Sequence, residues 1–356
     1  MTYFKQELAA RLTKQLFPPI LFCMTTKKYP LAVIGGGAAG MMALLRATLN
    51  NDEVLFFPGH FGVRKKSREM WINRVENMPT FAEYKKGIAD PNRKTLKWIL
   101  DCEFKENVHH MKGLGVTKLK KNDDGTFTLV DNEGTEYLAS YVILATGCMD
   151  VQPMIGGSHQ AILPYANAQK VEYCARCDGH HTHKQHTVIL GHGAGAASVA
   201  SLLAERYRHP SMTILTNGEE PGWDDDRKII LEKYRIDVNK KKIKEIVGEP
   251  KKGDLQGFRF EDDSLVQATY AFISLGMILY NELALEVGAE VDDRGFVVTD
   301  KIGHTNIDGF YVAGDLRAGI KNQIYTAWDS AVDSADHINA RLRETKRTLI
   351  LNNPDY

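Results

Sequence analysis

The chain has 356 residues, of which 43% are hydrophobic and 25% charged, a composition typical of ordinary globular proteins and long enough for two domains. Its 45 Lys and Arg residues balance its 45 Asp and Glu residues, so neither net charge nor a basic motif points to nucleic acid. Five scattered cysteines with one close pair favour a reducing, cytoplasmic setting over a secreted disulfide scaffold.

Residues 1–29 are expected to be an extension before the first domain. A short amphipathic helix ending at Pro18-Pro19 is predicted by apolar residues at every fourth position, Phe4, Leu8, Leu12 and Leu16. The apolar run at 20–24 is far too short to span a bilayer, so no membrane contact is predicted. A weak targeting segment and a start of synthesis at Met24 are both open interpretations. We prefer the second, because no small-residue cleavage site is present.

A nucleotide-binding turn is predicted at the start of the first domain. Residues 31–34 form a buried-strand run, and Gly35-Gly-Gly37-Ala38-Ala39-Gly40 follows directly and opens a helix. Glycines let the backbone approach a pyrophosphate, and the helix N-terminus offers free N–H groups. The second strand, 53–57, ends in Phe57 instead of an acid, so contacts to ribose must come from elsewhere.

The next segments are expected to be supporting structure. The cationic cluster at 64–68 is interpreted as a solvated face, with a contact to flavin phosphates or an acidic partner as the alternative. A helix is predicted over 94–104. Strands at 126–130 and 135–138 are predicted to form a hairpin, followed by a separate buried strand at 141–145 that ends in Thr146-Gly147.

One close cysteine pair, Cys174 and Cys177, is followed directly by Asp178. Such a pair can open and close a disulfide ring if one sulfur is held as a thiolate and two electrons are supplied. Structural zinc sites also use Cys-x-x-Cys, and His180, His181 and His183 could complete a Cys2His2 set. The first of these histidines follows Cys177 by only three residues, whereas zinc fingers place about a dozen residues between the two pairs.

A second nucleotide-type unit follows the cysteines. It comprises a strand at 187–190, the turn Gly191-His-Gly193-Ala-Gly-Ala196, a helix at 197–207 and a strand at 212–215. The end of that last strand, 216–220, contains no arginine for a 2′-phosphate and carries two glutamates that would repel one. The sequence therefore disfavours NADPH and leaves NADH open.

The last part of the chain is predicted to return to the first unit. A helix at 227–234 and strands near 236–248, 258–261 and 271–275 come first. The block 305–315 then delivers Gly314-Asp315 to a closing helix that starts within 321–327. This arrangement can place a carboxylate on ribityl hydroxyls while backbone N–H groups face a phosphate.

In combination, these motifs resemble the low-molecular-weight thioredoxin reductases over about residues 30–340. The resemblance rests on Gly35-x-Gly37-x-x-Gly40, Glu76-Asn77-x-Pro79, Ala145-Thr146-Gly147, Cys174-x-x-Cys177-Asp178, Gly191-x-Gly193-x-x-Ala196, Gly314-Asp315 and Gln323-Ile324. It implies an α/β fold of two Rossmann-like, three-layer dinucleotide-binding domains, one inserted into the other. We expect an FAD domain from 30–151 and 279–340, an inserted redox domain at 152–278, a tail at 341–356, and a homodimer.

The resemblance also implies roles for single residues. Cys177 would be the thiolate that faces the flavin, Cys174 the thiol that attacks the substrate disulfide, and Asp178 the general acid/base. FAD would be held by Gly35, Gly37, Ala38, Ala39, Gly40, Asn77, Thr146, Gly147, Gly314, Asp315, Gln323 and Ile324. The expected substrate is a thioredoxin-like protein disulfide. No metal is expected at the cysteines, because it would block the exchange chemistry.

Departures from the family pattern concern the electron donor. Members that use NADPH carry a His-Arg-Arg stretch where this chain has residues 216–220, and Gly-Gly-Gly-Asp-Ser where it has 191–195. These losses resemble branches that have abandoned NADPH, either driven by ferredoxin or another donor or acting as dithiol oxidases that pass electrons to oxygen. Aromatic-ended tails of such proteins can lie against the flavin, and this chain ends in Tyr356. A second flavin in the vacated site, ordinary NAD(P)H dependence and a flavoprotein with a structural metal segment are the alternatives.

Overall fold

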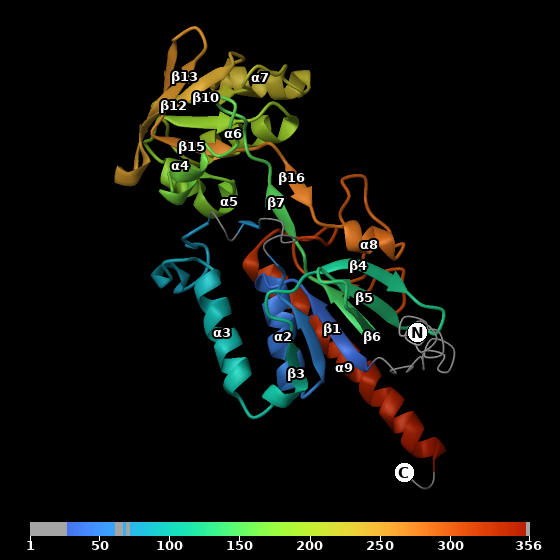
Figure 1. Ribbon diagram of the computed structural model, residues 1–356. Coiled ribbons are helices and arrows are strands. Elements are labelled where there is room, and N and C mark those ends of the chain that lie inside the picture. The colour runs from blue at the N-terminus through green and yellow to red at the C-terminus, as the bar shows by residue number, and fades with distance from the viewer. Residues whose placement is uncertain (1–26, 61–66, 69–71, 354–356) are drawn as a thin grey trace, which may run out of the picture.

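The computed structural model describes residues 27–60, 67–68 and 72–353, which fold into two lobes (Figure 1). Each lobe is built on its own sheet of mainly parallel strands, so the predicted α/β fold class is confirmed. The helix predicted within residues 1–18 lies outside the described residues. No helix in the described part of the chain is both long and apolar enough to cross a lipid bilayer.

The first sheet has seven strands in the order β3-β2-β1-β6-β5-β4, with β17 also paired to β6. Their bounds are β1 Lys28–Ile34, β2 Val54–Phe57, β3 Val108–His110, β4 Val116–Lys121, β5 Phe127–Asp131, β6 Glu136–Leu144 and β17 Phe310–Val312. The prediction of two strands at 135–138 and 141–145 was wrong. They form the single strand β6, because β1 pairs with it in one register from Leu138 to Leu144.

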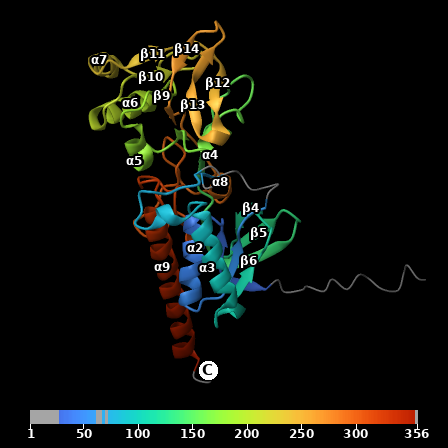
Figure 2. The same cartoon turned by 90° about the vertical axis from the view of Figure 1, so that its left-hand side faces the viewer.

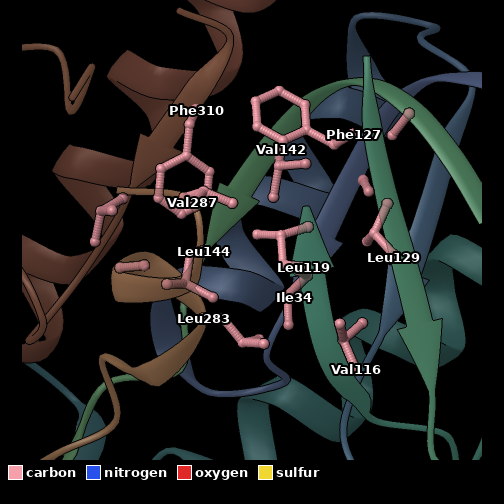
Figure 3. Close-up of a cluster of buried hydrophobic side chains, with 14 of the residues drawn as sticks. Ile34, Val116, Leu119, Phe127, Leu129, Val142, Leu144, Leu283, Val287 and Phe310 are labelled. Atoms are coloured by element: carbon pink, nitrogen blue, oxygen red, sulfur yellow. The ribbon is translucent and has the colours of Figure 1, made fainter. Parts of the chain in front are cut away.

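Side chains of β1 alternate between two cores. Leu31 and Val33 pack toward helices α2 Ala38–Leu49 and α9 Ile324–Asn352, with Ile99 of α3 Ala89–Asp101 in the same cluster. Ala32 and Ile34 face a second cluster, which includes β4, β5 and α8 Glu282–Glu286 (Figure 3). Burial on both faces explains why β1 is continuously apolar from Leu31 to Ile34 instead of alternating.

The second lobe contains a five-stranded parallel sheet in the order β11-β10-β9-β15-β8. Its strands are β8 Val171–Glu172, β9 Thr187–Leu190, β10 Met212–Leu215, β11 Asp237–Asn239 and β15 Tyr270–Ile273. Ile189 of β9 faces the helices α6 Ala194–Arg206 and α7 Asp225–Lys233. Val188 and Leu190 face the antiparallel sheet of β12 Ile243–Glu249, β13 Asp254–Phe260 and β14 Leu265–Gln267. The lobe therefore has three layers.

Short helical segments complete the described chain. They are α4 Leu163–Asn167, α5 Ala175–Asp178 and the 3₁₀ turns η2 Phe81–Glu83, η3 Lys105–Asn107, η4 Gly179–Thr182 and η5 Pro250–Lys252. Helix α5 lies on the side of the second lobe that faces the first (Figure 1). The cysteine pair, which begins at the N-cap of α5, is thereby placed between the two lobes.

Both passages of the chain between the lobes run through one antiparallel ladder. Strand β7 Cys148–Asp150 leaves the first sheet, and β16 Met277–Leu279 returns beside it (Figures 1 and 2). Residues 152–276 between these strands form the second lobe. We infer from this ladder that the domain boundaries predicted at 151/152 and 278/279 lie at β7 and β16.

The predicted tail at 341–356 is not a separate segment where the structure describes it. Residues 341–352 continue helix α9, and the helix runs away from the second lobe, so that the C-terminal end lies at the far end of the molecule (Figures 1 and 2). Within one chain, the described tail therefore leads away from the site built by the first glycine turn. Tyr356 itself lies outside the described residues.

Candidate active site

A cavity of about 390 Å³ opens at the carboxyl ends of the first parallel sheet and reaches the cysteine pair. This edge of an open α/β sheet is where ligands are generally bound. Nearly all of the predicted site residues line the cavity: Gly35, Gly37, Ala38, Ala39, Asn77, Thr146, Gly147, Cys174, Cys177, Asp178, Gly314, Asp315, Gln323 and Ile324. The fold thus brings together segments that are up to about 290 residues apart in the sequence.

The first glycine turn has two different physical tasks. Gly35 has φ +117°, and a Cβ on it would lie 2.3 Å from the Ala145 carbonyl oxygen, so only glycine allows β1 and the end of β6 to approach this closely. Gly37 is the N-cap residue of α2, and a Cβ on it would meet nothing within 4 Å. The open space at Gly37, beside the free N–H groups of the helix start, is what a phosphate needs.

Gly40 corrects the sequence prediction. It was expected to bind the cofactor, but it does not line the cavity. A Cβ at this position would lie 1.8 Å from the Gly35 carbonyl oxygen and 3.4 Å from the Ala145 Cβ. Gly40 therefore permits close packing of helix α2 against the turn and the end of β6.

The other end of the chain adds Gly314 and Asp315 directly after β17. The Gly314 N–H donates to Ser330 Oγ at 3.0 Å, which fixes the turn to helix α9. Asp315 is partly buried, and desolvation raises its pKa to about 6. Its Oδ2 lies 3.9 Å from the Cys148 thiol, whose pKa burial raises to about 12. Asp315 thus offers hydrogen-bond capacity to a ligand in the cavity, while Cys148 stays a neutral thiol.

Cys174 and Cys177 are joined in a disulfide that borders the same cavity. Cys174 is the N-cap residue of α5, and its Sγ accepts a hydrogen bond from the Cys177 N–H at 3.2 Å. A donor at this sulfur stabilises a thiolate there when the disulfide is open. The Cys174–Cys177 segment therefore forms a compact turn closed by a disulfide, and its sulfurs are not arranged as metal ligands.

Gln323 contacts both sulfurs, which sequence reasoning did not anticipate. Its Nε2 lies 3.6 Å from Cys174 Sγ, and its Oε1 lies 3.4 Å from Cys177 Sγ. The Asn77 side chain holds this amide in place by donating to Gln323 Oε1 at 2.7 Å. Two residues that were predicted to bind the cofactor thus also position the redox pair.

A buried pair of acids lies behind the disulfide. Burial raises the pKa of Asp178 to about 7, against an opposing effect of His180. Burial and the charge of Asp178 raise the pKa of Glu172, on β8, well above its usual range. Two carboxyl groups in one apolar setting do not both ionise at neutral pH, so one proton is held close to the sulfurs.

Glu172, Tyr270 and Arg68 were missed by the sequence analysis. Glu172 stands two residues before Cys174, and only its buried-strand setting next to the cysteines could have singled it out. Burial and the charge of the nearby Glu172 raise the pKa of the Tyr270 hydroxyl above its usual range. No local signal identifies Tyr270, because β15 is nearly a hundred residues further along the chain.

Arg68 contradicts the interpretation of 64–68 as a solvated face. Its guanidinium forms a bidentate pair with Asp150, with both N–O distances at 2.7 Å, and the two side chains are 20% and 7% exposed. Asp150 belongs to β7, so this pair joins the segment before α3 to the ladder between the lobes. The other cations of the cluster, residues 64–66, lie outside the described residues.

We expect Asp150→Asn to lower the free energy of unfolding by about 3 kcal/mol, because it leaves the Arg68 charge buried without its partner. Urea denaturation of the purified protein measures this. Asp308→Asn is the matched control, since the Asp308–Arg341 pair is 70% and 32% exposed and should contribute less than about 1 kcal/mol. Equal effects of the two substitutions would contradict a special role for the buried pair.

In the second lobe, the glycine turn at 191–196 lies beside the segment after β10, which contains Glu219 and Glu220. Two cations that follow β10 are paired with acids: Lys240 lies 2.6 Å from Glu220, and Arg227 pairs with Asp224. The Gly222 N–H donates to the His192 carbonyl oxygen at 2.7 Å, which folds the segment after β10 back onto the turn. A 2′-phosphate bound here would lie near carboxylates, and both Lys240 and Arg227 are already paired with an acid.

Comparison with known proteins places this arrangement in a family. Residues 29–335 match the model of the family described as pyridine nucleotide-disulphide oxidoreductase. A thioredoxin reductase of Treponema pallidum is 27% identical over 84% of this chain and 92% of its own length, and one of Listeria monocytogenes is 27% identical over 91% and 97%. The crystal structure of thioredoxin reductase from Streptococcus pyogenes matches with a TM-score of 0.72 at 22% identity, over 89% of this chain and 99% of that one.

The chain belongs to the pyridine nucleotide-disulphide oxidoreductase family. Within this family it falls in the low-molecular-weight thioredoxin reductase class and is a flavin-dependent disulfide oxidoreductase. The predicted pair of Rossmann-like domains is confirmed by the similarity to the solved thioredoxin reductase. These conclusions rest on matches that span almost the whole described chain.

The residues around the cavity fit FAD. Gly37 leaves open space at the start of α2, and the carboxyl group of Asp315 lines the same cavity. Ser67 also lines it, and its buried Oγ finds no hydrogen-bond partner among the described residues. Buried polar groups generally form hydrogen bonds, so Ser67 Oγ is suited to hydrogen-bond to a polar ligand in the cavity.

Proposed function

We propose that this chain binds FAD in the cavity and uses the Cys174–Cys177 pair to reduce a thioredoxin-like protein disulfide. The observation that carries this proposal is that the first glycine turn, the Gly314-Asp315 turn and the disulfide all line one cavity. When bound there, FAD would supply the two-electron chemistry that thiols alone cannot start.

The residues proposed to hold FAD divide into three groups. Gly35, Gly37, Ala38 and Ala39 form the turn and helix start that suit the pyrophosphate. Gly314, Asp315 and Ile324 come from the end of β17 and the start of α9. The third group is Asn77, Thr146, Gly147 and Gln323; the Thr146 hydroxyl donates to the Tyr280 carbonyl oxygen at 2.7 Å, so Thr146 shapes the cavity wall mainly through its backbone.

The exchange chemistry assigned to the cysteines balances in two steps. The Cys174 thiolate attacks one sulfur of the substrate disulfide, a mixed disulfide forms, and the other substrate sulfur leaves as a thiolate that takes up a proton. The Cys177 thiolate then attacks Cys174 Sγ, which restores the internal disulfide and releases the second substrate thiol. Asp178 is proposed as the proton donor and acceptor, since its raised pKa lets it hold a proton beside the sulfurs.

Cys174 and Cys177 both line the cofactor cavity, so the cofactor and a protein disulfide need access to the same pair. We infer that the second lobe moves relative to the first during turnover, so that the pair alternates between the cavity and the substrate. The ladder of β7 and β16 supports this inference, because both passages of the chain run through it and a change there would move the lobe as a unit.

We propose that NADPH is not the electron donor. The support is the acidic segment after β10, whose neighbouring cations Lys240 and Arg227 are already paired with carboxylates. Reduced ferredoxin is the donor that we expect. NADH, another donor and a second flavin in the second Rossmann unit are the alternatives.

An anaerobic titration of the FAD-loaded protein tests the donor. NADPH and then NADH are added while absorbance of the flavin band is followed, and reduced ferredoxin is added last. We expect no bleaching at stoichiometric nucleotide and full bleaching with ferredoxin or dithionite. Prompt bleaching by NADPH would show that residues 216–220 do not exclude it. A dithiol oxidase would instead consume oxygen in proportion to an added dithiol.

The homodimer and the cytoplasmic location predicted from the sequence remain predictions. The first rests on the resemblance alone, and the second on the small number of scattered cysteines. Light scattering of the eluted protein would decide the oligomeric state.

A further inference from the structure

Three side chains from distant segments meet beside the redox pair, outside the cavity. Glu76 belongs to the segment before η2, whereas His180 and His181 belong to η4, which follows α5 directly. Glu76 Oε2 lies 2.9 Å from His180 Nε2 and 2.7 Å from His181 Nε2. One potential ligand atom of each residue lies within 4.8 Å of the others. The fold thus assembles two imidazoles and one carboxylate around a common point.

We propose that Glu76, His180 and His181 form a binding site for a divalent transition metal of the zinc type. Two imidazole nitrogens and one carboxylate oxygen are a donor set that such ions prefer. In a tetrahedral zinc site, ligand atoms at about 2.0 Å from the ion are roughly 3.3 Å apart. The observed separations from Glu76 Oε2 need to lengthen by only a few tenths of an ångström when the ion takes the place of the two protons.

The surroundings of the three ligands support the same function. His181 Nδ1 lies 2.9 Å from the Tyr270 hydroxyl. With Nε2 on a metal, Nδ1 carries the ring proton and donates a hydrogen bond to the Tyr270 oxygen. Such a partner behind a histidine ligand fixes its tautomer and its orientation.

The exposed side of the cluster leaves room for further ligands. The His180 side chain is 49% exposed, compared with 26% for His181 and 18% for Glu76. Water can therefore complete the coordination shell. The second oxygen of Glu76 lies 2.7 Å from Arg74 Nε, an ion pair that orients the carboxylate and leaves Oε2 directed at the histidines.

This site differs from the Cys2His2 set that the sequence left open. The two cysteines are bonded to each other and offer no thiolate, whereas the histidines point to a carboxylate over one hundred residues earlier in the chain. The proposed site is therefore independent of the cysteines. Because Glu76 adjoins Asn77 and η4 adjoins α5, a bound ion would tie together the two segments that carry Asn77 and the redox pair.

Metal binding is tested on the full chain without a histidine tag, after treatment with a chelator and with the disulfide oxidised. Zn²⁺ is titrated in competition with a chromophoric chelator, and Co²⁺ is titrated while its visible bands above 550 nm are recorded. We expect one ion per chain. Glu76→Gln, His180→Gln and His181→Gln should each weaken binding at least about tenfold, and Tyr270→Phe about tenfold through His181.

Two controls distinguish this site from metal binding by neighbouring histidines or by the cysteines. His183→Gln, an exposed histidine in the same segment, should bind zinc like the unchanged protein. The double variant Cys174→Ser/Cys177→Ser should also keep the site. Loss of binding in the double variant, equal binding in His180→Gln and the unchanged protein, or the absence of stoichiometric binding would each overturn the proposal. His180 is half-exposed, so its variant is expected to fold.

Discussion

Replacing Cys174 with serine should lower the rate of protein-disulfide reduction by at least about 1,000-fold, as expected for loss of an attacking nucleophile. The serine hydroxyl is a poor nucleophile at neutral pH, so the mixed disulfide with the substrate cannot form. FAD content should stay unchanged, because the substitution leaves intact the glycine turns that we propose to hold the cofactor. In this variant Cys177 has no disulfide partner, so it should be detected as a free thiol.

The measurement uses protein that has been reduced anaerobically with dithionite and freed of excess reductant. Oxidised thioredoxin is added, and the new thioredoxin thiols are counted against time. Cys102→Ser is the matched control, since Cys102 is a free, partly buried cysteine whose thiol donates to the Ile99 carbonyl oxygen. Unchanged reduction by the Cys174 variant would disprove the assigned role of this residue.

The second large effect is expected at the first glycine turn. Gly35→Ala forces a side chain onto φ +117° and against the Ala145 carbonyl oxygen. Strain and overpacking together should cost on the order of 3 kcal/mol and separate β1 from the end of β6. The purified variant should be colourless, because the turn can no longer hold the flavin nucleotide.

Gly37→Ala should weaken FAD binding without the loss of stability that is expected for Gly35→Ala. Its N-cap conformation, with φ −75°, suits alanine, and a Cβ there meets nothing within 4 Å. The melting temperature of the FAD-free protein should therefore stay within about 2 °C, whereas FAD affinity should fall about tenfold, or 1.4 kcal/mol. Flavin fluorescence during titration of the FAD-free protein measures this affinity. Retention of full affinity would show that no phosphate is bound at Gly37.

Local patterns in the sequence predicted the parts of the site that are made by consecutive residues. The glycine turn after β1, the cysteine pair with Asp178, and Gly314-Asp315 after a strand all carry their chemistry within a few positions. Parallel strands then bring the turns to one edge of a sheet, which explains why nearly every predicted residue lines the cavity.

Pairs of distant residues were out of reach of such patterns. Arg68 meets Asp150 across 82 positions, and His181 meets Glu76 across 105. The sequence around Arg68 contains mostly cations, which favoured a solvated face. Only the tertiary structure shows that one of them is taken up by a carboxylate of the ladder.

Boundaries were predicted less well than elements. Residues 139–140 were left between two predicted strands, but β1 pairs on both sides of Ser140 in one register. At the C-terminus, residues 341–356 were predicted to be a tail. Residues 341–352 continue helix α9, because one face of the helix packs on the core as far as Leu342 and regular backbone hydrogen bonds carry it further.

The ladder of β7 and β16 also bears on how such a chain could have arisen. Cys148 faces Leu279 and Asp150 faces Met277, so the second lobe leaves and re-enters the first at adjacent points. The two strands pair like those of a β-hairpin, but the whole second lobe takes the place of the short connecting loop. A short turn joining them would leave the first sheet with the same strand order, so a single gene insertion between two paired strands suffices to combine the two lobes.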